Sequence, residues 1–275
     1  MRLHVVLPNE STAMEPGQLL DLAQQAARLG FDTAWLPDHV LPPKPYGTTF
    51  GGVYEPLVTL AAIAATTGTI RLGTSVLILP LRNPFVLAKQ VATLDRISGS
   101  RVVLGVGIGW DRQEFASVGA DFTTRGAQAD EAIDLLRHLW SSTPDAAKTF
   151  DGERYRFADG VFAPRPNEGT VPLMVGGTSD AALRRAARVA DMWQAVGIGP
   201  KEFASRRNQL LAAAARPIEA GARTSWTGAD RPLADVVAEA KQWREVGADH
   251  LSVWFGAAEG FGDRMERFMA EVEPR

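Results

Sequence analysis

The chain has 275 residues, of which 45% are hydrophobic and 22% charged, the composition of a globular protein with a large core. A formal net charge of −3 argues against nucleic acid or an anionic membrane as the main partner. Cysteine is absent, which excludes disulfides, thiolate metal sites and a cysteine nucleophile.

The amino terminus, MRLHVVLP, is a strand-like run and not a signal peptide. No apolar stretch approaches the roughly 18 uninterrupted residues of a membrane-spanning helix. Only four histidines occur, none of them in an HxH pair, so we expect no metal ion. These features predict a cytoplasmic protein that acts on a small molecule, with no nucleic-acid or membrane partner.

Strand-like and helix-like segments alternate along the chain. Apolar runs predict strands, and apolar stripes at helical spacing, begun by Pro and ended by Gly, predict helices. In chain order the predicted strands are residues 3–7, 31–37, 70–79, 101–107, 171–175, 191–196, 218–226 and 250–255. The predicted helices are residues 16–29, 56–67, 84–98, 126–140, 179–190, 200–215, 230–246 and 262–272.

Residues 143–170 interrupt this alternation with three prolines, three glycines and short alternating runs, which predict an excursion containing a small hairpin. Eight strand–helix pairs predict an α/β fold, a single (β/α)8 TIM barrel over residues 1–275 with this excursion between the fourth helix and the fifth strand. An open doubly wound sheet is the alternative. It is disfavoured because no GxGxxG follows the first strand.

In such a barrel the active site forms at the carboxyl ends of the strands. Of the four histidines, only His39 follows such an end, and its neighbour Asp38 is placed to orient or charge the ring. An imidazole carries a proton readily near pH 7, so we expect His39 and Asp38 to be catalytic. The alternative is a structural histidine that caps the following loop.

Two glycine clusters also lie at strand ends. Gly176, Gly177 and Thr178 separate a strand from a helix start, where exposed backbone can approach an anion; the alternative is a tight turn with a serine cap. Gly107 and Gly109 leave room for a planar ring against the backbone, or else serve close barrel packing. Further expected pocket walls are Asn9, Glu10 and Trp193.

The loop at residues 40–54 is long for its position and contains three prolines, three glycines and three aromatic residues. A long loop at a catalytic face is often a lid, so we expect either a lid or a dimer contact here.

Several stretches of the chain resemble the luciferase-like monooxygenase superfamily. They are WLPDHV (35–40), IRLGTSVLILPLRNPFVLAKQVATLDRISGSRVVLGVGIGW (70–110), FTTRGAQADEAIDLLRHLW (122–140), FDGERYRF (150–157) and PLMVGG (172–177). The short chain and the pairing of LGTSV with GVGxGW resemble the branch that uses coenzyme F420 more than the branch that uses FMN.

The resemblance implies a non-prolyl cis peptide between Ser75 and Val76 that backs the deazaflavin ring. It also implies that His39 lies near the ring's C5, and that Gly176, Gly177 and Thr178 surround the cofactor phosphate. A hydride would pass between C5 and a small organic substrate while His39 moves the proton, in a homodimer formed through the early helices.

Sugar-phosphate dehydrogenases of this group have a carboxylate where this chain has Trp110, so the resemblance makes that substrate improbable. Two other functions stay open. One is an FMN-dependent monooxygenase that uses reduced flavin and oxygen, and the other is a non-catalytic cofactor-binding barrel.

Overall fold

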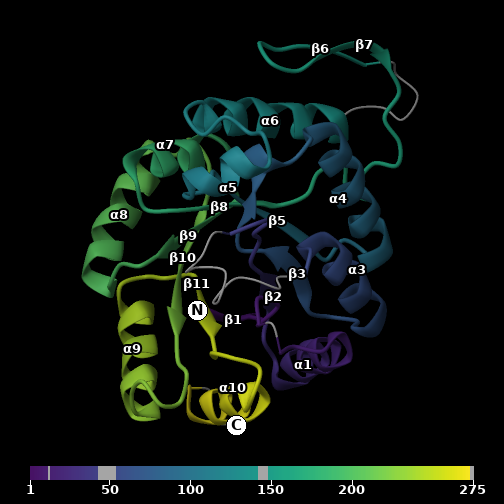
Figure 1. The fold of residues 1–275 in the computed structure, drawn as a ribbon. Helices are drawn as coiled ribbons and strands as arrows, with labels where there is room; N and C mark the ends of the chain where they lie inside the picture. The colour runs from purple at the N-terminus through teal and green to yellow at the C-terminus, as the bar shows by residue number, and fades with distance from the viewer. Residues whose placement is uncertain (12, 43–53, 142–147, 273–275) are drawn as a thin grey trace.

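A closed barrel of parallel strands forms the centre of the protein (Figure 1). The computed structural model describes residues 1–11, 13–42, 54–141 and 148–272. Around the barrel the order is β3-β2-β1-β11-β10-β9-β8-β5, and β3 pairs with β5 to close the circle. The strands are β1 (Arg2–Val6), β2 (Thr33–Leu36), β3 (Arg71–Thr74) with its continuation β4 (Leu77–Ile78), β5 (Val102–Gly107), β8 (Leu173–Gly176), β9 (Met192–Val196), β10 (Glu219–Ser225) and β11 (His250–Trp254).

Helices surround these strands and cover the outside of the barrel (Figure 1). They are α1 (Pro16–Leu29), α3 (Pro56–Thr66), α4 (Pro84–Ser98), α6 (Arg125–Trp140), α7 (Asp180–Val189), α8 (Pro200–Ala213), α9 (Leu233–Glu245) and α10 (Phe261–Val272). Two short helices, η1 (Leu79–Leu81) and α5 (Arg112–Ser117), lie in the loops after the third and fourth barrel strands. The predicted TIM barrel is confirmed.

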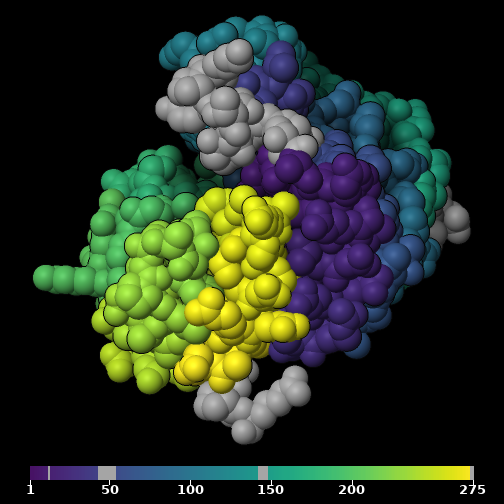
Figure 2. All heavy atoms as spheres, turned by 60° about the horizontal axis from the view of Figure 1, so that its bottom comes forward, coloured from purple at the N-terminus to yellow at the C-terminus, as the bar shows by residue number. Residues whose placement is uncertain are grey.

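The first and last units of the chain meet where the barrel closes. β1 pairs in parallel with β11, and in Figure 2 the carboxyl-terminal segment (yellow) packs directly against the amino-terminal one (purple). The predicted hairpin is also present: β6 (Lys148–Asp151) and β7 (Arg156–Gly160) pair antiparallel and project from the ring of helices (Figure 1). Across the described ranges, none of the helices combines the length and the apolar character required to span a bilayer.

Helix ends follow the punctuation seen in the sequence. At the start of α4, the side chain of Asn83 accepts hydrogen bonds from the amides of Phe85 and Val86, just ahead of Pro84. At the other end, Gly99 adopts a left-handed conformation (φ 69°) that reverses the chain, as Gly30 does after α1 (φ 91°). Proline at the start and glycine at the end therefore mark the bounds of α1 and α4.

The barrel interior is filled by large side chains packed over glycines. A Cβ added to Gly73 would lie 2.2 Å from the Trp35 ring, and one added to Gly221 would lie 2.2 Å from the His250 ring. These contacts leave no room for a side chain at either glycine. The interior is therefore a packed core at this level, as is usual for an eight-stranded barrel.

Two buried histidines stack near the amino-terminal end of the barrel. The rings of His4 and His250 lie 4.8 Å apart and 11° from parallel. The indole Nε1 of Trp35 donates to His4 Nδ1 at 3.1 Å, and His4 Nε2 lies 3.2 Å from Asp32 Oδ1. Because His4 Nδ1 accepts a hydrogen bond from the Trp35 indole N–H, the His4 ring is neutral with its proton on Nε2. Burial lowers the pKa of both histidines.

Arg101 binds the backbone at the ends of two helices. Its guanidinium donates to the carbonyls of Ala64 and Thr67 at the end of α3, to Ile70 at 2.9 Å, and to Ser98 at 2.7 Å. One side chain therefore satisfies several of the carbonyls that helix ends leave without partners.

Replacing Arg101 with Met is expected to lower the free energy of unfolding by about 2–3 kcal/mol, because several hydrogen bonds to partly buried carbonyls are lost together. Urea unfolding of both proteins measures the difference. Arg96→Met is the matched control, since the Arg96 guanidinium bonds Asn167 at an exposed position and its loss should cost little. Equal stability of wild type and Arg101→Met would contradict the expectation.

Candidate active site

A cavity of about 810 Å³ opens at the carboxyl ends of the barrel strands. Its volume is in the range of small-molecule and cofactor sites. His39, Ser75, Val76, Gly107, Gly109, Gly176 and Gly177 all line it, and Asp38 reaches its wall. The strand-end rule thus brings together every residue predicted to be catalytic or to bind the cofactor except Thr178, which is outside the described lining. Their roles remain predictions.

The cavity has two chemically different sides. Arg223 on β10, Trp254 on β11, Glu10 after β1 and His39 after β2 come from consecutive barrel positions and form what we call the polar arc. The opposite side, from β5 through β8 to β9, consists of glycines and apolar side chains: Gly107, Ile108, Gly176, Gly177, Val196 and Ile198. A flat apolar ring is suited to the second side and polar substrate atoms to the first.

His39 is paired with a carboxylate that the sequence analysis did not single out. Glu114, on the short helix α5, places Oε2 3.0 Å from His39 Nδ1. Its other oxygen accepts from the amides of Val40 (2.7 Å) and Leu41 (3.1 Å), and its side chain is 1% exposed. This fixed carboxylate holds the imidazole orientation, so proton exchange with a bound molecule has to use Nε2.

Asp38 does not contact the imidazole beside it. Its Oδ2 accepts from the amide of Ile78 at 2.9 Å, and its Oδ1 accepts from Arg82 at 2.6 Å. Arg82 also bonds Glu55 at 2.7 Å. The prediction that Asp38 orients His39 is therefore corrected: Asp38 ties the end of β2 to β4 and η1, while Glu114 orients the ring.

The Ser75–Val76 peptide is cis, as the resemblance implied. The Ser75 hydroxyl donates to Gln194 Oε1 at 2.5 Å, and Gln194 Nε2 donates to Ser252 Oγ at 2.6 Å. This buried chain crosses the barrel from β3 to β9 and β11. It holds the backbone at residue 75 in a defined position at the cavity base.

Val76 explains two of the predicted glycines. A Cβ on Gly107 would lie 2.5 Å from Val76 Cγ2, and a Cβ on Gly176 would lie 2.6 Å from Val76 Cγ1. The isopropyl group of Val76 thus occupies the space that a side chain would fill at Gly107, where room for a ring was expected, and at Gly176, where an approach to an anion was expected.

Gly109 and Trp110 continue the glycine-rich strand end. Gly109 has a left-handed backbone (φ 73°), and a Cβ there would lie 2.7 Å from the Phe115 ring, so close packing accounts for this glycine. Trp110 lines the cavity, is 49% exposed, and presents its ring edge-on to His39 at 5.8 Å. Trp110 is therefore a wall next to the imidazole.

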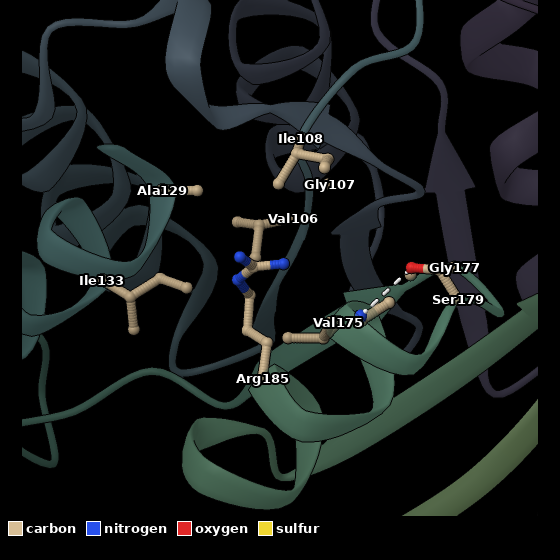
Figure 3. A pocket seen from close by; sticks show the side chains of 11 residues that line it. Val106, Gly107, Ile108, Ala129, Ile133, Val175, Gly177, Ser179 and Arg185 are labelled. Atoms are coloured by element: carbon tan, nitrogen blue, oxygen red, sulfur yellow. Dashed lines mark hydrogen bonds between the residues drawn. The ribbon is translucent and has the colours of Figure 1, made fainter. Parts of the chain in front are cut away.

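The turn between β8 and α7 contains Gly177, Thr178 and Ser179. Gly177 has φ 113°, its amide donates to the Gln194 carbonyl at 3.2 Å, and its carbonyl accepts from the indole of Trp193 at 2.8 Å. The Ser179 hydroxyl accepts from the amide of Ala182 and so caps α7 (Figure 3). Trp193 is fully buried and supports this turn through that hydrogen bond. The expectation that Trp193 forms a wall of the cavity is therefore wrong.

A second, smaller cavity of about 90 Å³ lies behind these glycines, between β5, β8, α6 and α7 (Figure 3). It shares Gly107 and Gly177 with the larger cavity. The Arg185 guanidinium points into it toward Val106, and it is fixed by Asp130 at 2.8 and 2.9 Å. The smaller cavity therefore adjoins the main cavity, and the charge of Arg185 in its wall is balanced by Asp130.

Among the expected walls at the end of β1, only Glu10 faces the cavity. Asn9 is buried and donates to the carbonyls of Pro37 and Tyr54 at 3.1 Å, so it connects loops. Glu10 is 5% exposed, and burial raises the pKa of its carboxyl group. Within the described residues, Glu10 Oε2 and the Trp254 indole nitrogen are buried without a hydrogen-bond partner.

The cavity is closed at its base. Val76 and Trp254 pack onto a cluster of fully buried side chains inside the barrel, formed by Val6, Trp35, Val103, Met174 and Met192. Below that cluster lie the stacked histidines.

Sequence reasoning missed Glu114 and Arg223, although each had a signal. Asp111 and Glu114 have the spacing of a helix amino-terminal box, and Asp111 indeed caps α5 by accepting from the Glu114 amide at 2.8 Å. Arg223 lies two residues beyond Gly221 in β10, on the strand face that points into the barrel. A charged residue on that face near the carboxyl end is a pocket residue.

Comparison with known proteins agrees with this architecture. The chain is 36% identical over 213 residues to an F420-dependent glucose-6-phosphate dehydrogenase of Kineococcus radiotolerans, covering 76% of this chain and 60% of that protein. It is 35% identical over 219 residues to the uncharacterized protein Rv0940c of Mycobacterium tuberculosis, covering 75% and 73%. The structure of an F420-dependent secondary alcohol dehydrogenase superposes with a TM-score of 0.83 at 17% identity, covering 99% of both chains, and so shares the fold.

The chain thus spans about three fifths of the length of the first of these relatives. A family model described as luciferase-like monooxygenase matches residues 1–261, nearly the whole chain. Together with the barrel and its cis peptide, this match assigns the family: the chain belongs to the luciferase-like monooxygenases.

Proposed function

We propose that the protein is an F420-dependent oxidoreductase that transfers a hydride between the deazaflavin C5 and a small organic substrate. The observation that carries this proposal is the His39–Glu114 pair facing a cavity of about 810 Å³ whose other side is apolar. An imidazole held by a buried carboxylate is suited to moving the proton that accompanies a hydride. The relative with 36% identity is named as F420-dependent, which supports the choice of cofactor.

The residues present fit this cofactor. Val76, Ile108, Val196 and Ile198 offer a flat apolar surface for the ring. Gly177 and Thr178 would receive the phosphate next to the start of α7, where the helix dipole favours an anion. Because the Gly177 amide already donates to Gln194, that glycine would contribute close approach rather than a donor.

When bound, F420 supplies or accepts the hydride at C5. His39 would hold or deliver the proton through Nε2, since Nδ1 faces Glu114. Trp110 and Trp254 would exclude water from the reacting atoms, and Ser75, Gln194 and Ser252 would keep the ring's support in place. Asp38 and Arg82 would fix the strand end that presents His39.

The cofactor choice is tested by titrating the protein with F420 and with FMN and following ring fluorescence. We expect F420 to bind at least tenfold more tightly than FMN, and reduced F420 to give no oxygen uptake. Tight FMN binding together with oxygen consumption by reduced flavin would instead make the protein an FMN-dependent monooxygenase.

Homodimer formation and a cytoplasmic location remain proposals. Val58 on α3 and Val86 and Ile97 on α4 are more than half exposed, which supports a contact through the early helices. Residues 43–53, which hold most of the expected lid or dimer-contact loop, lie outside the described residues.

A further inference from the structure

Arg223 is a cation that lines the cavity and has no ion-pair partner among the residues that the structure describes. There it makes a single long hydrogen bond, from NH1 to the Ser75 carbonyl at 3.4 Å. Burial lowers the pKa of this guanidinium, while Glu10 favours its charged form from a distance. A guanidinium remains protonated at neutral pH even so.

Apart from Glu10, the other titratable groups in the described cavity wall have direct partners. Asp38 pairs with Arg82 at 2.6 Å, and His39 meets Glu114 at 3.0 Å. Glu239 accepts from Thr224 at 3.1 Å and from Trp243 at 2.9 Å, and it pairs with Arg231. Arg223 therefore differs from them in facing the cavity with donors to spare.

Two further groups beside Arg223 in the polar arc have unused hydrogen-bonding capacity. The Trp254 indole N–H lies on the neighbouring strand β11, and Glu10 lies in the turn after β1. Within the described residues neither the indole nitrogen nor Glu10 Oε2 makes a hydrogen bond of normal geometry, although the indole lies close enough to Glu10 to favour its charged form. Arg223 thus has neighbours in the polar arc that do not occupy its donors, and unused donors at a cavity wall indicate a ligand that supplies an acceptor.

A carboxylate is the functional group that best matches the donors of Arg223 and Trp254. A guanidinium donates two parallel hydrogen bonds to a planar carboxylate, and an indole N–H beside it can donate a third. We infer that Arg223, Trp254 and Glu10 form a carboxylate subsite, and that the substrate is a small organic acid whose carboxylate pairs with Arg223. This inference names the substrate class of the proposed oxidoreductase and depends on that proposed function only for the reaction, not for the binding.

Glu10 is compatible with such a ligand. Burial disfavours the charged form of the Glu10 carboxyl group and so raises its pKa, which reduces the repulsion between Glu10 and a substrate carboxylate. The carboxylate would then be held at the polar arc, with the rest of the molecule directed toward His39 and the apolar side of the cavity.

The test compares a planar acid with its neutral amide, without cofactor. Binding of cinnamate and of cinnamamide to the full-length protein is measured by calorimetry. We expect wild type to prefer cinnamate roughly 10- to 100-fold, the range expected from charge-assisted hydrogen bonds. Arg223→Gln should remove the preference by weakening cinnamate binding while leaving cinnamamide binding within about threefold, and Arg223→Lys should retain part of it.

Arg188→Gln is the matched control, because Arg188 lies on α7 and pairs with Asp130 and Asp134 outside the cavity. It should bind both probes like wild type. Equal affinity of wild type for acid and amide, or a preference that survives Arg223→Gln, would overturn the inference. Circular dichroism of each variant shows whether lost binding reflects unfolding.

The same proteins titrated with F420 separate the two proposals. If the acid preference depends on Arg223 but F420 does not bind, the subsite stands and the cofactor proposal fails. If F420 binds and the acid preference is absent, the cofactor proposal stands and the carboxylate subsite is wrong.

Discussion

Replacing His39 with Ala is expected to slow hydride-transfer turnover by about 10²- to 10⁴-fold, the usual contribution of a positioned acid or base. Binding of F420 should change by less than about threefold, because the ring's surface is formed by Val76 and the apolar side of the cavity. Stopped-flow absorbance of the deazaflavin gives the rate, with the best acceptor found in a panel of organic acids and carbonyl compounds. Ring fluorescence gives the affinity.

His138→Ala is the control, since His138 lies on α6 beside Phe150 and away from the cavity. Glu114→Gln gives an intermediate case: it keeps an oxygen for the amides of Val40 and Leu41 but removes the charge facing Nδ1. We expect kcat to fall about tenfold in that variant with KM nearly unchanged. Unaltered turnover in His39→Ala would show that His39 does not move the proton, and F420 binding without any turnover in the wild type would favour a non-catalytic cofactor-binding barrel.

Mild acid is expected to destabilise the protein through the two stacked histidines. Both have a pKa lowered by burial, so the folded state keeps them neutral while the unfolded chain protonates them near its ordinary value of 6.5. The stability they contribute is therefore complete above about pH 6.5 and is lost as the pH falls below it. Protonation of His4 would also remove the acceptor for the Trp35 indole.

The measurement is the free energy of unfolding in urea between pH 7 and pH 5. Each histidine that stays neutral in the folded state adds a slope of up to about 1.4 kcal/mol per pH unit. In His250→Phe, a ring of similar shape that cannot titrate, the slope should be smaller by about that amount, whatever the variant's stability at pH 7.

Wild type and variant must be compared at each pH, because groups such as Glu10, whose pKa burial raises, act in the opposite direction. An identical slope in His250→Phe would show that the stacked histidines do not govern acid stability.

The barrel was predictable because its determinants are local. Proline at the first position of α4 and α8 and left-handed glycines after α1 and α4 mark helix ends, and apolar runs between the helices mark buried strands. Strand ends then predict which residues meet at the cavity, which is how His39 and Gly176 were found without coordinates.

The partners of those residues were not predictable in the same way. Asp38 is adjacent to His39 in sequence, but neighbouring residues at the end of a strand point to opposite sides, and Asp38 turns to Arg82. The imidazole instead meets Glu114, 75 residues further along the chain, through the placement of a helix of six residues. Side-chain pairing across loops depends on tertiary geometry that periodicity does not contain.

The glycines illustrate a second limit. Gly107 and Gly176 were expected to make space for a ligand, and the sequence pattern is correct that no side chain fits there. The occupant of that space is Val76, whose position depends on the backbone between β3 and β4. A glycine in a sequence can indicate that another group lies close to the backbone, but it does not identify that group.

The closed base of the cavity has a consequence for the order of events during turnover. Trp35, Met174 and Met192 fill the barrel beneath Val76. Within the described part of the chain the cavity therefore opens only at the strand ends. A molecule bound at the closed base therefore reaches solvent only through that opening, and another molecule bound nearer the strand ends lies in its path. Bound molecules are therefore exchanged at the strand ends and not through the interior of the barrel.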